Sequence, residues 1–331
     1  MSLLKVRDLK MWYAQGRDWV RAVDGVSFEI GKGKTLGIIG ESGCGKTSLG
    51  FSLMRLLPSN GKIIHGEIFL NDVDLTKISE EEMRQIRWAR VSMIFQAAMN
   101  AFDPVQKVGD QLVEALRTHR SLAVHDAKQE VRGLFEMVGI EPSRMGSYPH
   151  EFSGGMRQRA MLAMSLVCHP DLVIADEPTT ALDVVVQDQI LEKMRILQKQ
   201  LGIAMILISH DVSVIMETCE RTAVMYGGQI VEEGSTTSIF KNPRHPYTKA
   251  LLQSFPSIKG DVRQLISLPG TPPDLSNPPP ACRFEPRCPL AQDLCRETDP
   301  ALVKVGRNHH SKCHFATSPE LSNVRFQDET V

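Results

Sequence analysis

The sequence lacks a long apolar run. Its longest continuous one covers only residues 203–208, whereas a helix that spans a bilayer needs about 20 apolar residues. The first residues, Met1–Lys5, do not lead into the apolar core of a secretory signal. We therefore expect a soluble chain in the cytoplasm, which excludes integral membrane proteins and secreted proteins.

The sequence also lacks a large excess of positive or negative charge. Lys and Arg number 38 and Asp and Glu number 39, which gives a formal net charge of -1. Proteins that bind nucleic acids or adhere to anionic membranes usually carry a basic excess, so we expect no nucleic-acid partner. The 331 residues are enough for about two domains with a large core.

Disulfides are not expected, and the spacing of a zinc knuckle is missing. In a reducing compartment the 7 cysteines would be thiols or metal ligands. Four of them, Cys282, Cys288, Cys295 and Cys313, lie in the last 50 residues without a C-x-x-C pair, which disfavours zinc. Four thiolates suit an iron–sulfur cluster. Zinc and unliganded thiols remain the alternatives.

What the sequence does contain is a phosphate-binding loop. Residues 40–47 follow the pattern G-x-x-x-x-G-K-[ST]: Gly40, Glu41, Ser42, Gly43, Cys44, Gly45, Lys46 and Thr47. The apolar run Leu36–Ile39 predicts a strand before the loop, and helical periodicity up to Leu57 predicts a helix after it. In that context the glycines let backbone N–H groups surround an anion at the positive end of the helix dipole. Lys46 then reaches the β- and γ-phosphates and Thr47 binds Mg²⁺, so we predict that the chain binds a nucleoside triphosphate.

Cys44 has an unusual place inside this loop. Its neighbours are inward-turned N–H groups, the ammonium group of Lys46 and a helix N-terminus. Each of these favours thiolate over thiol, so we predict a pKa below that of a free cysteine and a reactive side chain. The alternative is an inert thiol that is packed between the helix and the sheet.

Two later strands are predicted to end in side chains that suit phosphate chemistry. The apolar run before Asp176 and Glu177 predicts a buried strand that presents two carboxylates. Asp176 would hold Mg²⁺, and Glu177 would polarise the attacking water. Gln96 ends a second buried run, and its amide oxygen suits Mg²⁺ or that water.

A histidine and a pair of glycines complete the set. His210 follows another buried run, where it would donate to the γ-phosphate or to the water. Ser153, Gly154 and Gly155 open a predicted helix, in which the serine is a good N-cap and the glycines leave the backbone open to an anion. Residues 108–160, which include the start of this helix, have helical periodicity, which predicts a helical subdomain inserted in an α/β core.

The order of these motifs resembles that of the nucleotide-binding subunits of ABC transporters, across about residues 3–240. The resemblance implies an α/β fold, a P-loop NTPase (RecA-like) core with an N-terminal antiparallel β-subdomain and a helical subdomain at about residues 97–165. Residues 1–240 would form the nucleotide-binding domain. Residues 241–331 would form a C-terminal extension with a Pro-rich linker and the four-cysteine site.

The same resemblance assigns roles to residues. It implies a head-to-tail dimer with an identical or paralogous subunit, in which the Ser-Gly-Gly segment completes the γ-phosphate site of the partner and Asp183 contacts that partner. Tyr13 would stack on adenine, and Gln96 would link the ATP site to the membrane subunits. The nucleotide-binding set is Tyr13, Gly40, Glu41, Ser42, Gly43, Cys44, Gly45, Lys46, Thr47, Ser48, Gln96, Ser153, Gly154, Gly155, Asp176 and Asp183. The catalytic set is Lys46, Gln96, Glu177 and His210, and the Mg²⁺ ligands are Thr47, Gln96 and Asp176.

The C-terminal sequence narrows the family. His245, Pro246 and Tyr247, within residues 242–252, resemble the oligopeptide/dipeptide importer branch, whose members are similar to this chain in the cysteine region too. This resemblance implies an ATPase on the cytoplasmic face of the membrane that energises peptide uptake through two permease subunits. A solute-binding protein would act indirectly, and ATP, Mg²⁺ and a [4Fe–4S] cluster would be the cofactors.

Two alternatives to peptide uptake stay open. Nickel complexes and oligosaccharides use importers of this branch, and the solute never touches this subunit, so the sequence does not identify it. The other alternative is a soluble ABC ATPase of translation or DNA repair. Such proteins usually carry two cassettes or a long coiled coil, whereas this sequence shows one cassette and no long heptad run.

Overall fold

The computed structural model describes residues 2–96, 101–180, 182–254 and 270–324. The chain divides into two compact units, each assembled from segments that are far apart in the sequence. The first consists of Met1–Leu4, Glu29–Thr35 and Phe69–Ile208, and the second of Lys5–Phe28, Leu36–Ile68 and Ser209–Val331. The domain boundary predicted at residue 240 stays a prediction. The predicted start of the helical subdomain, at residue 97, lies outside the described residues.

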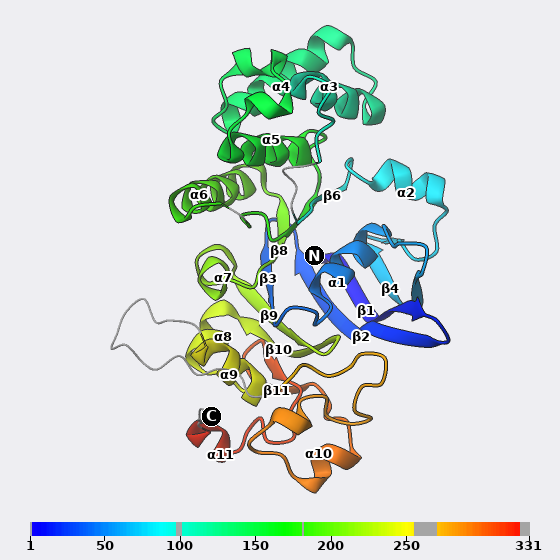
Figure 1. Cartoon of the computed structure of the whole chain (residues 1–331), viewed down its shortest axis with the longest axis vertical. Helices are drawn as coiled ribbons and strands as arrows, with labels where there is room; N and C mark the ends of the chain where they lie inside the picture. Colours follow the sequence, from blue (N-terminus) through cyan, green and yellow to red (C-terminus); the bar gives the residue numbers. More distant parts are fainter. Residues whose placement is uncertain (1, 97–100, 181, 255–269, 325–331) are drawn as a thin grey trace. The chain divides into compact units, whose positions relative to one another are not determined.

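The first unit contains a parallel sheet in the order β8-β7-β6, of which Figure 1 labels the strands β8 and β6. Its strands pair in parallel and all their residues are buried: β6 (Val91–Ile94), β7 (Leu172–Asp176) and β8 (Ala204–Ile208). Continuously buried, mainly apolar strands of this kind are typical of parallel sheets that are covered on both faces. The strand ends therefore bring Asp176 and, two residues beyond β6, Gln96 to one edge of this sheet.

The rest of the first unit is mainly helical, as the periodicity of residues 108–160 predicts. Its helices are α2 (Glu80–Ile86), α3 (Val108–His119), α4 (Val124–Met137), α5 (Gly154–Leu166) and α6 (Val184–Leu201), with short 3-10 helices at Pro142–Gly146 and Pro149–Glu151. α3 and α4 pack on each other and on α5, all in green in Figure 1. Gly202, with φ 63, ends α6.

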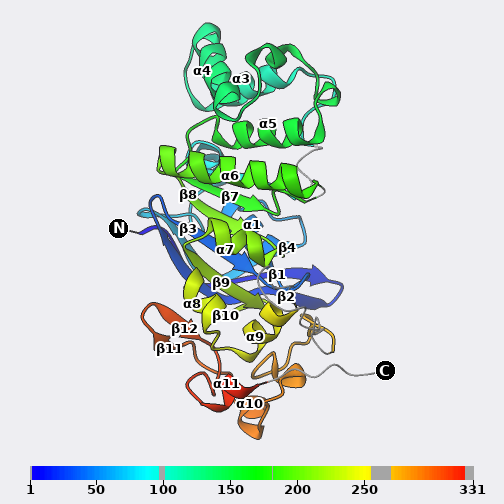
Figure 2. The same ribbon diagram turned by 90° about the vertical axis from the view of Figure 1, so that its left-hand side faces the viewer.

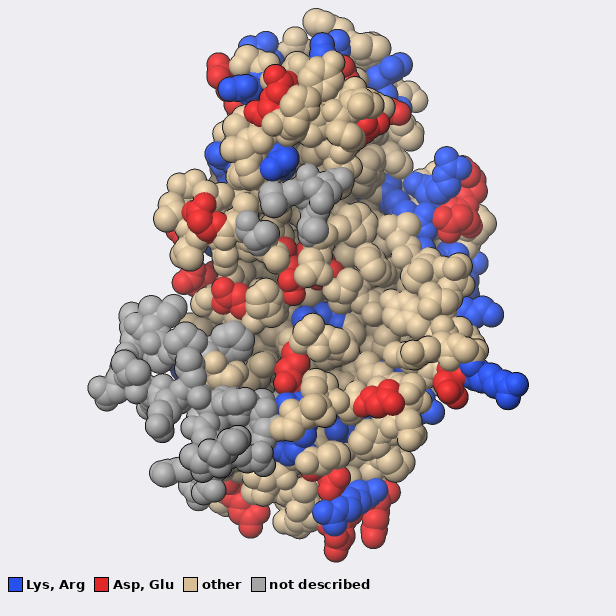
Figure 3. All heavy atoms as spheres, in the orientation of Figure 1, with Lys and Arg blue, Asp and Glu red and all other residues tan. Residues whose placement is uncertain are grey.

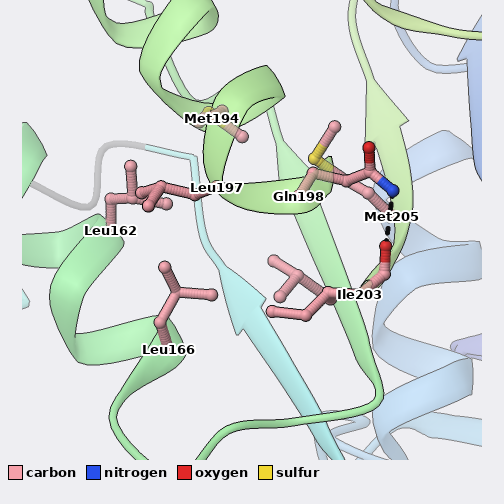
Figure 4. A pocket seen from close by; sticks show the side chains of 8 residues that line it. Leu162, Leu166, Met194, Leu197, Gln198, Ile203 and Met205 are labelled. Atoms are coloured by element: carbon pink, nitrogen blue, oxygen red, sulfur yellow. Dashed lines mark hydrogen bonds between the residues drawn. The ribbon is translucent and has the colours of Figure 1, made fainter. Parts of the chain in front are cut away.

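A small cavity lies in the core of this unit, where side chains from α5, α6, β7 and β8 meet (Figure 4). Its volume is about 20 Å³, and it is lined by Leu162, Leu166, Val173, Met194, Leu197, Gln198, Ile203 and Met205. The Gln198 amide donates to the carbonyl oxygens of Ile203 at 2.7 Å and of Gly33 at 3.0 Å. A space of this size holds about one water molecule, so it is a packing gap and not a ligand site.

The second unit contains most of an N-terminal sheet in the order β2-β1-β4. The strands are β1 (Ser2–Gln15), β2 (Asp18–Gly31) and β4 (Gly61–Leu70). The chain turns between β1 and β2 at Gly16, with φ 65. In the first unit, the last residues of β4 pair antiparallel with β5 (Val73–Asp74), Phe69 opposite Asp74.

The phosphate-binding loop follows a strand of the second unit, β3. The neighbouring strands follow the order β3-β9-β10-β12-β11 (Figure 2), with bounds β3 (Thr35–Ile39), β9 (Arg221–Tyr226), β10 (Gln229–Ser235), β12 (His309–Ser311) and β11 (Val303–Gly306). β3 and β9 are parallel, and β9 and β10 form a hairpin about Gly227 and Gly228. β12 pairs antiparallel with β10. The C-terminal extension is therefore built into the same sheet.

Short helices complete the second unit: α1 (Lys46–Met54), α7 (Val212–Thr218), α8 (Thr236–Lys241), α9 (Pro246–Gln253), α10 (Asp293–Glu297) and α11 (Glu320–Asn323), with a 3-10 helix at Glu285–Arg287. α1 ends before the predicted Leu57, because Arg55 adopts a left-handed conformation, with φ 49. Among the residues described above, no helix is long and apolar enough to cross a membrane. Acidic and basic side chains are interspersed over the face in Figure 3, in line with the balanced charge of the sequence.

Candidate functional site

The phosphate-binding loop connects β3 to α1, as predicted. Gly45 is the N-cap of α1 with φ 103, and Gly40 has φ 155. A Cβ on Gly45 would lie 2.0 Å from the carbonyl oxygen of Ala22, and one on Gly40 would lie 2.2 Å from that of Met225. Both positions therefore need glycine for space as well as for backbone conformation. A Cβ on Gly43 would meet nothing within 4 Å.

Lys46 begins α1, and its side chain turns back into the loop. The ammonium group is buried and donates to the carbonyl oxygens of Gly40 at 2.7 Å and Glu41 at 2.8 Å. The positive charge therefore lies within the loop that would enclose a phosphate. Farther along α1, Ser48 accepts a hydrogen bond from the Tyr13 hydroxyl at 3.1 Å. This contact places Tyr13 of β1 beside the first turn of the helix.

The prediction that the Cys44 thiol has a lowered pKa is wrong. Its side chain is 5% exposed, and burial raises the pKa of the thiol above its ordinary value, although the Lys46 ammonium group 3.7 Å away lowers it. A Cβ on Gly40 would lie 2.8 Å from the Cys44 sulfur, so the sulfur packs against the loop backbone. The cost of desolvating the charged form outweighs the attraction of one neighbouring cation, so the packed side chain favours the thiol over the thiolate.

In the first unit, β7 ends in Asp176 and leads into Glu177, as predicted. Asp176 is 1% exposed. Glu177 has φ 47, a left-handed conformation that is unfavourable for residues other than glycine and that is enriched at functional sites. Its carboxylate accepts hydrogen bonds from Gln96 Nε2 at 2.9 Å and from Thr180 Oγ1 at 3.1 Å. The structure thus brings together two of the predicted catalytic residues and adds a threonine to them.

Ser153 and Asp183 are helix N-caps. Ser153 Oγ accepts from the N–H of Met156 at 3.3 Å at the start of α5, and Asp183 Oδ1 accepts from the N–H of Val186 at 3.0 Å at the start of α6. A Cβ on Gly155 would lie 2.8 Å from Val186 Cγ1, so this glycine lets the two helix starts approach closely. The sequence predicts the first cap. The signal for the second is an aspartate directly before a helical run.

His210 belongs to the second unit, with the phosphate-binding loop. The residue before it, Ser209, donates its N–H to the carbonyl oxygen of Ile38 at 3.2 Å, near the end of β3. Because β3 runs directly into the loop, His210 lies near the sheet edge from which the loop departs. Its role toward the γ-phosphate stays a prediction.

The four cysteines of the extension are free thiols. Burial is the main cause that raises the pKa of Cys288 and that of Cys313 to about 12, and neighbouring thiols contribute in the same direction. Cys282 donates its N–H to the carbonyl oxygen of Cys295 at 3.1 Å. The four therefore gather in one region. Within the described ranges, however, no three His, Cys, Asp or Glu side chains are arranged to hold a metal ion. The positions of the four cysteine side chains therefore do not support the iron–sulfur site expected there.

Sequence reasoning missed three side chains at these sites. Thr180 contacts Glu177, as described above. Tyr247 Oη accepts a hydrogen bond from the Glu41 N–H at 2.8 Å, and Arg287 donates to the Glu41 carboxylate. The His-Pro-Tyr segment marks Tyr247 as unusual without indicating this contact. Nothing in the sequence around Arg287 indicates that it reaches the loop.

Comparison with known proteins decides the family. Residues 23–180 match the family model described as ABC transporter, and residues 231–295 match the C-terminal region of oligopeptide/dipeptide transporters. The dipeptide transport ATP-binding protein DppD of Bacillus subtilis is 45% identical over 315 residues, 94% of this chain and 94% of that protein. The chain belongs to the ABC transporter family, in its oligopeptide/dipeptide branch. This ABC ATPase is also 42% identical to DppD of Escherichia coli, over 95% of its own length and 97% of that relative.

Solved structures agree with the fold. The ATP-binding cassette MJ0796, a dimer in a post-hydrolysis state bound to ADP and Pi, matches with a TM-score of 0.64 at 22% identity, over 70% of this chain and 98% of its own. The protein cbiO1 of Clostridium perfringens, part of the ABC transporter complex cbiONQ, gives 0.63 at 24% identity, over 73% of this chain and 91% of its own. The P-loop NTPase class predicted from the sequence is confirmed, and the chain is an ATPase of this family.

Proposed function

We propose that this ATPase energises the uptake of di- and oligopeptides through a membrane importer. The observation that carries the proposal is the match of residues 231–295 to the C-terminal region of oligopeptide/dipeptide transporters. The His245-Pro246-Tyr247 segment lies within this match, and Tyr247 is fully buried and bonded to the phosphate-binding loop. Two permease subunits would form the transport pathway and a solute-binding protein would act through them. The ATPase would lie peripherally on the cytoplasmic face of the membrane.

Hydrolysis would depend on positioning and on charge stabilisation. Lys46 and the N–H groups of the loop would bind the phosphates, with Tyr13 stacked on the adenine ring. Glu177 would polarise the water that attacks the γ-phosphorus, and His210 would donate to the γ-phosphate. The hydrogen bonds from Gln96 and Thr180 to Glu177 support this role, because they orient the carboxylate.

Thr47, Gln96 and Asp176 would hold the Mg²⁺ ion. A hydroxyl, an amide oxygen and a buried carboxylate are the oxygen donors that this hard cation prefers. Asp176 is 1% exposed, and a carboxylate is costly to bury so completely unless it serves a cation or a hydrogen-bond network. When bound, the ion supplies positive charge to the phosphate oxygens.

A second subunit, identical or paralogous, would complete each ATP site in a head-to-tail dimer. Ser153 is exposed at the start of α5. Asp183 is followed by Val184 and Val185, which are 81% and 67% exposed. Adjacent apolar side chains that are exposed to this extent favour burial against a partner, and they lie directly beside the residues assigned to that contact.

Transport assays in cells test the solute. Deletion of this chain is expected to abolish the uptake of labelled di- and tripeptides, and the wild-type chain is expected to restore it. Lys46→Ala should not restore uptake, because the loop loses the charge that binds the phosphates. The exposed Lys77, which pairs with Asp74 at 2.9 Å, offers a control in Lys77→Ala, which should restore uptake fully.

The same strains distinguish the alternatives. If peptide uptake persists in the deletion strain while uptake of nickel or of oligosaccharides is lost, the peptide assignment is wrong and the branch alternative holds. If the chain co-purifies with ribosomes in place of membrane subunits, it is a soluble ABC ATPase.

We also propose that Cys282, Cys288, Cys295 and Cys313 bind a [4Fe–4S] cluster. Four free thiols in one small extension have the number and type of ligands for it, and the backbone bond between Cys282 and Cys295 keeps two of them adjacent. The thiol side chains would have to turn toward the cluster from their described positions. Zinc and unliganded thiols are the alternatives.

Metal content tests this proposal. The chain purified without oxygen is expected to be brown, with about four iron and about four acid-labile sulfide ions per chain. Cys288→Ser should bleach the colour, whereas Cys168→Ser, at a buried thiol outside the extension, should leave it unchanged. Colourless protein, with stoichiometric zinc or with no metal, would rule the cluster out.

A further inference from the structure

The C-terminal extension contacts the phosphate-binding loop at Glu41. Arg287 Nη1 donates to Glu41 Oε2 at 2.7 Å, and Arg287 Nη2 donates to Glu41 Oε1 at 3.0 Å. The side chain of Arg287 is 4% exposed and that of Glu41 is 24% exposed. A bidentate ion pair of this kind fixes the orientation of the carboxylate and also neutralises its charge.

A second part of the C-terminal region holds the backbone of the same residue. Tyr247 is fully buried in α9, and its hydroxyl accepts a hydrogen bond from the Glu41 N–H at 2.8 Å. Its ring packs against the rings of Tyr226 and Phe284, with centroids 4.5 and 5.5 Å away. The Tyr226 hydroxyl accepts a hydrogen bond from Arg287 at 3.3 Å. Glu41 is thus held at its N–H and at its carboxylate by buried groups that pack on one another.

Glu41 is in turn bonded to the lysine of the loop. The ammonium group of Lys46 donates to the carbonyl oxygen of Glu41 at 2.8 Å, so a continuous path of contacts runs from Arg287 through Glu41 to Lys46. The Glu41 carboxylate also brings a negative charge to a loop that has to accept an anion. Repulsion between this charge and a bound phosphate would weaken binding unless a cation compensates for it.

We propose that Arg287 is a positioning residue for nucleotide binding. Its guanidinium group neutralises Glu41 and holds the start of the loop, so that Lys46 keeps its place and ATP affinity depends on the C-terminal extension. Arg287 acts through Glu41 and does not touch the phosphates. The proposal relies on the ATPase activity of the family and on these contacts. It is independent of the transported solute and of what the cysteines bind.

Arg287→Met tests the proposal, because it keeps an unbranched apolar side chain and removes the charge. KM for MgATP is expected to rise about 10- to 100-fold, the factor that corresponds to losing a hydrogen bond between charged groups. The kcat at saturating ATP should change less than about 3-fold, because the lost interaction serves binding and not the chemical step. The assay uses the full chain assembled with its membrane subunits, and titration of the full chain with ATP should show the same loss of affinity.

Two further variants separate this role from a merely structural one. Arg287→Lys keeps the charge and loses the fork-shaped pair of donors, so its KM should be intermediate. The double variant Glu41→Gln with Arg287→Met no longer contains the carboxylate that needs compensation, so its KM should return to that of Glu41→Gln alone. An extension that only stabilises the fold would give the double variant a defect at least as large as that of Arg287→Met.

Arg296→Met is the matched control. Arg296 lies in the same extension, is 61% exposed, and pairs with Glu285 at 2.8 Å and Asp293 at 3.0 Å, so KM should stay at the wild-type value. A wild-type KM in Arg287→Met, or a double variant that is not rescued, would overturn the proposal. If thermal unfolding shows that Arg287→Met does not fold, Arg287→Lys decides the question, and a wild-type KM in that variant would overturn the proposal equally.

Discussion

Glu177→Gln is expected to abolish ATP hydrolysis while ATP binding persists. Glutamine keeps the size of the side chain, and its amide oxygen can accept the hydrogen bonds that Gln96 and Thr180 donate to Glu177. It loses the carboxylate that polarises the attacking water, so we expect turnover to fall by about 10²- to 10⁴-fold. Because binding is intact and cleavage is blocked, the ATP-bound dimer should accumulate.

A steady-state ATPase assay with the membrane subunits present measures the turnover, and size-exclusion chromatography with ATP measures the dimer. Glu192→Gln serves as the control, since Glu192 lies on the surface of α6 and pairs with Arg195 at 2.6 Å. Wild-type turnover in Glu177→Gln would remove this residue from the catalytic role. An equal loss in both variants would indicate general damage to the first unit.

Gly45→Ala is expected to abolish ATP binding and to destabilise the second unit. Its Cβ would lie 2.0 Å from the carbonyl oxygen of Ala22, in a residue with φ 103. The left-handed conformation costs about 1–2 kcal/mol for an L-residue, and forcing an extra group into a packed site costs about 1–3 kcal/mol. The free energy of unfolding should therefore fall by about 2–5 kcal/mol. Gly45 is the N-cap of α1, so any shift that relieves the collision also displaces the N–H groups that would bind phosphate.

Gly43→Ala is the matched variant, because Gly43 lies in the same loop with φ 78 but has open space where a Cβ would be. It should lose only the conformational term, about 1–2 kcal/mol, and should keep measurable ATP binding. Urea unfolding and ATP titration of both variants make the comparison. Equal losses in the two variants would mean that the backbone near Ala22 moves aside at little cost. The close packing of Gly45 against Ala22 would then contribute neither to stability nor to ATP binding.

Much of the local structure could be predicted from the sequence, because the responsible interactions are between residues close in the chain. The apolar run 172–175 coincides with β7 up to its last residue, Asp176, since a strand covered on both faces is built mainly from apolar residues. Gly202 ends α6 because the left-handed C-cap position favours glycine. The end of α1 was not predictable in this way, because Arg55 takes up a left-handed conformation that apolar periodicity does not reveal.

Cys44 illustrates where local reasoning fails. The sequence correctly places its thiol beside Lys46, and the 3.7 Å contact confirms that neighbour. Whether the thiol ionises depends on how much water reaches it, and that is set by the packing of distant segments around the loop. Burial raises the pKa of this thiol more than the lysine lowers it, so the tertiary structure reverses the prediction.

The sequence by itself determined the family, the phosphate-binding loop and the order of the catalytic motifs, because a P-loop needs only contiguous residues with the right backbone freedom. Only the tertiary structure placed Arg287 on Glu41, a residue 246 positions away in the chain, and Tyr247 on the backbone of the same loop. Charges that meet across such distances leave no periodicity and no local spacing. They pair because β12 joins the sheet beside β10 and folds the C-terminal extension into the unit that contains the loop.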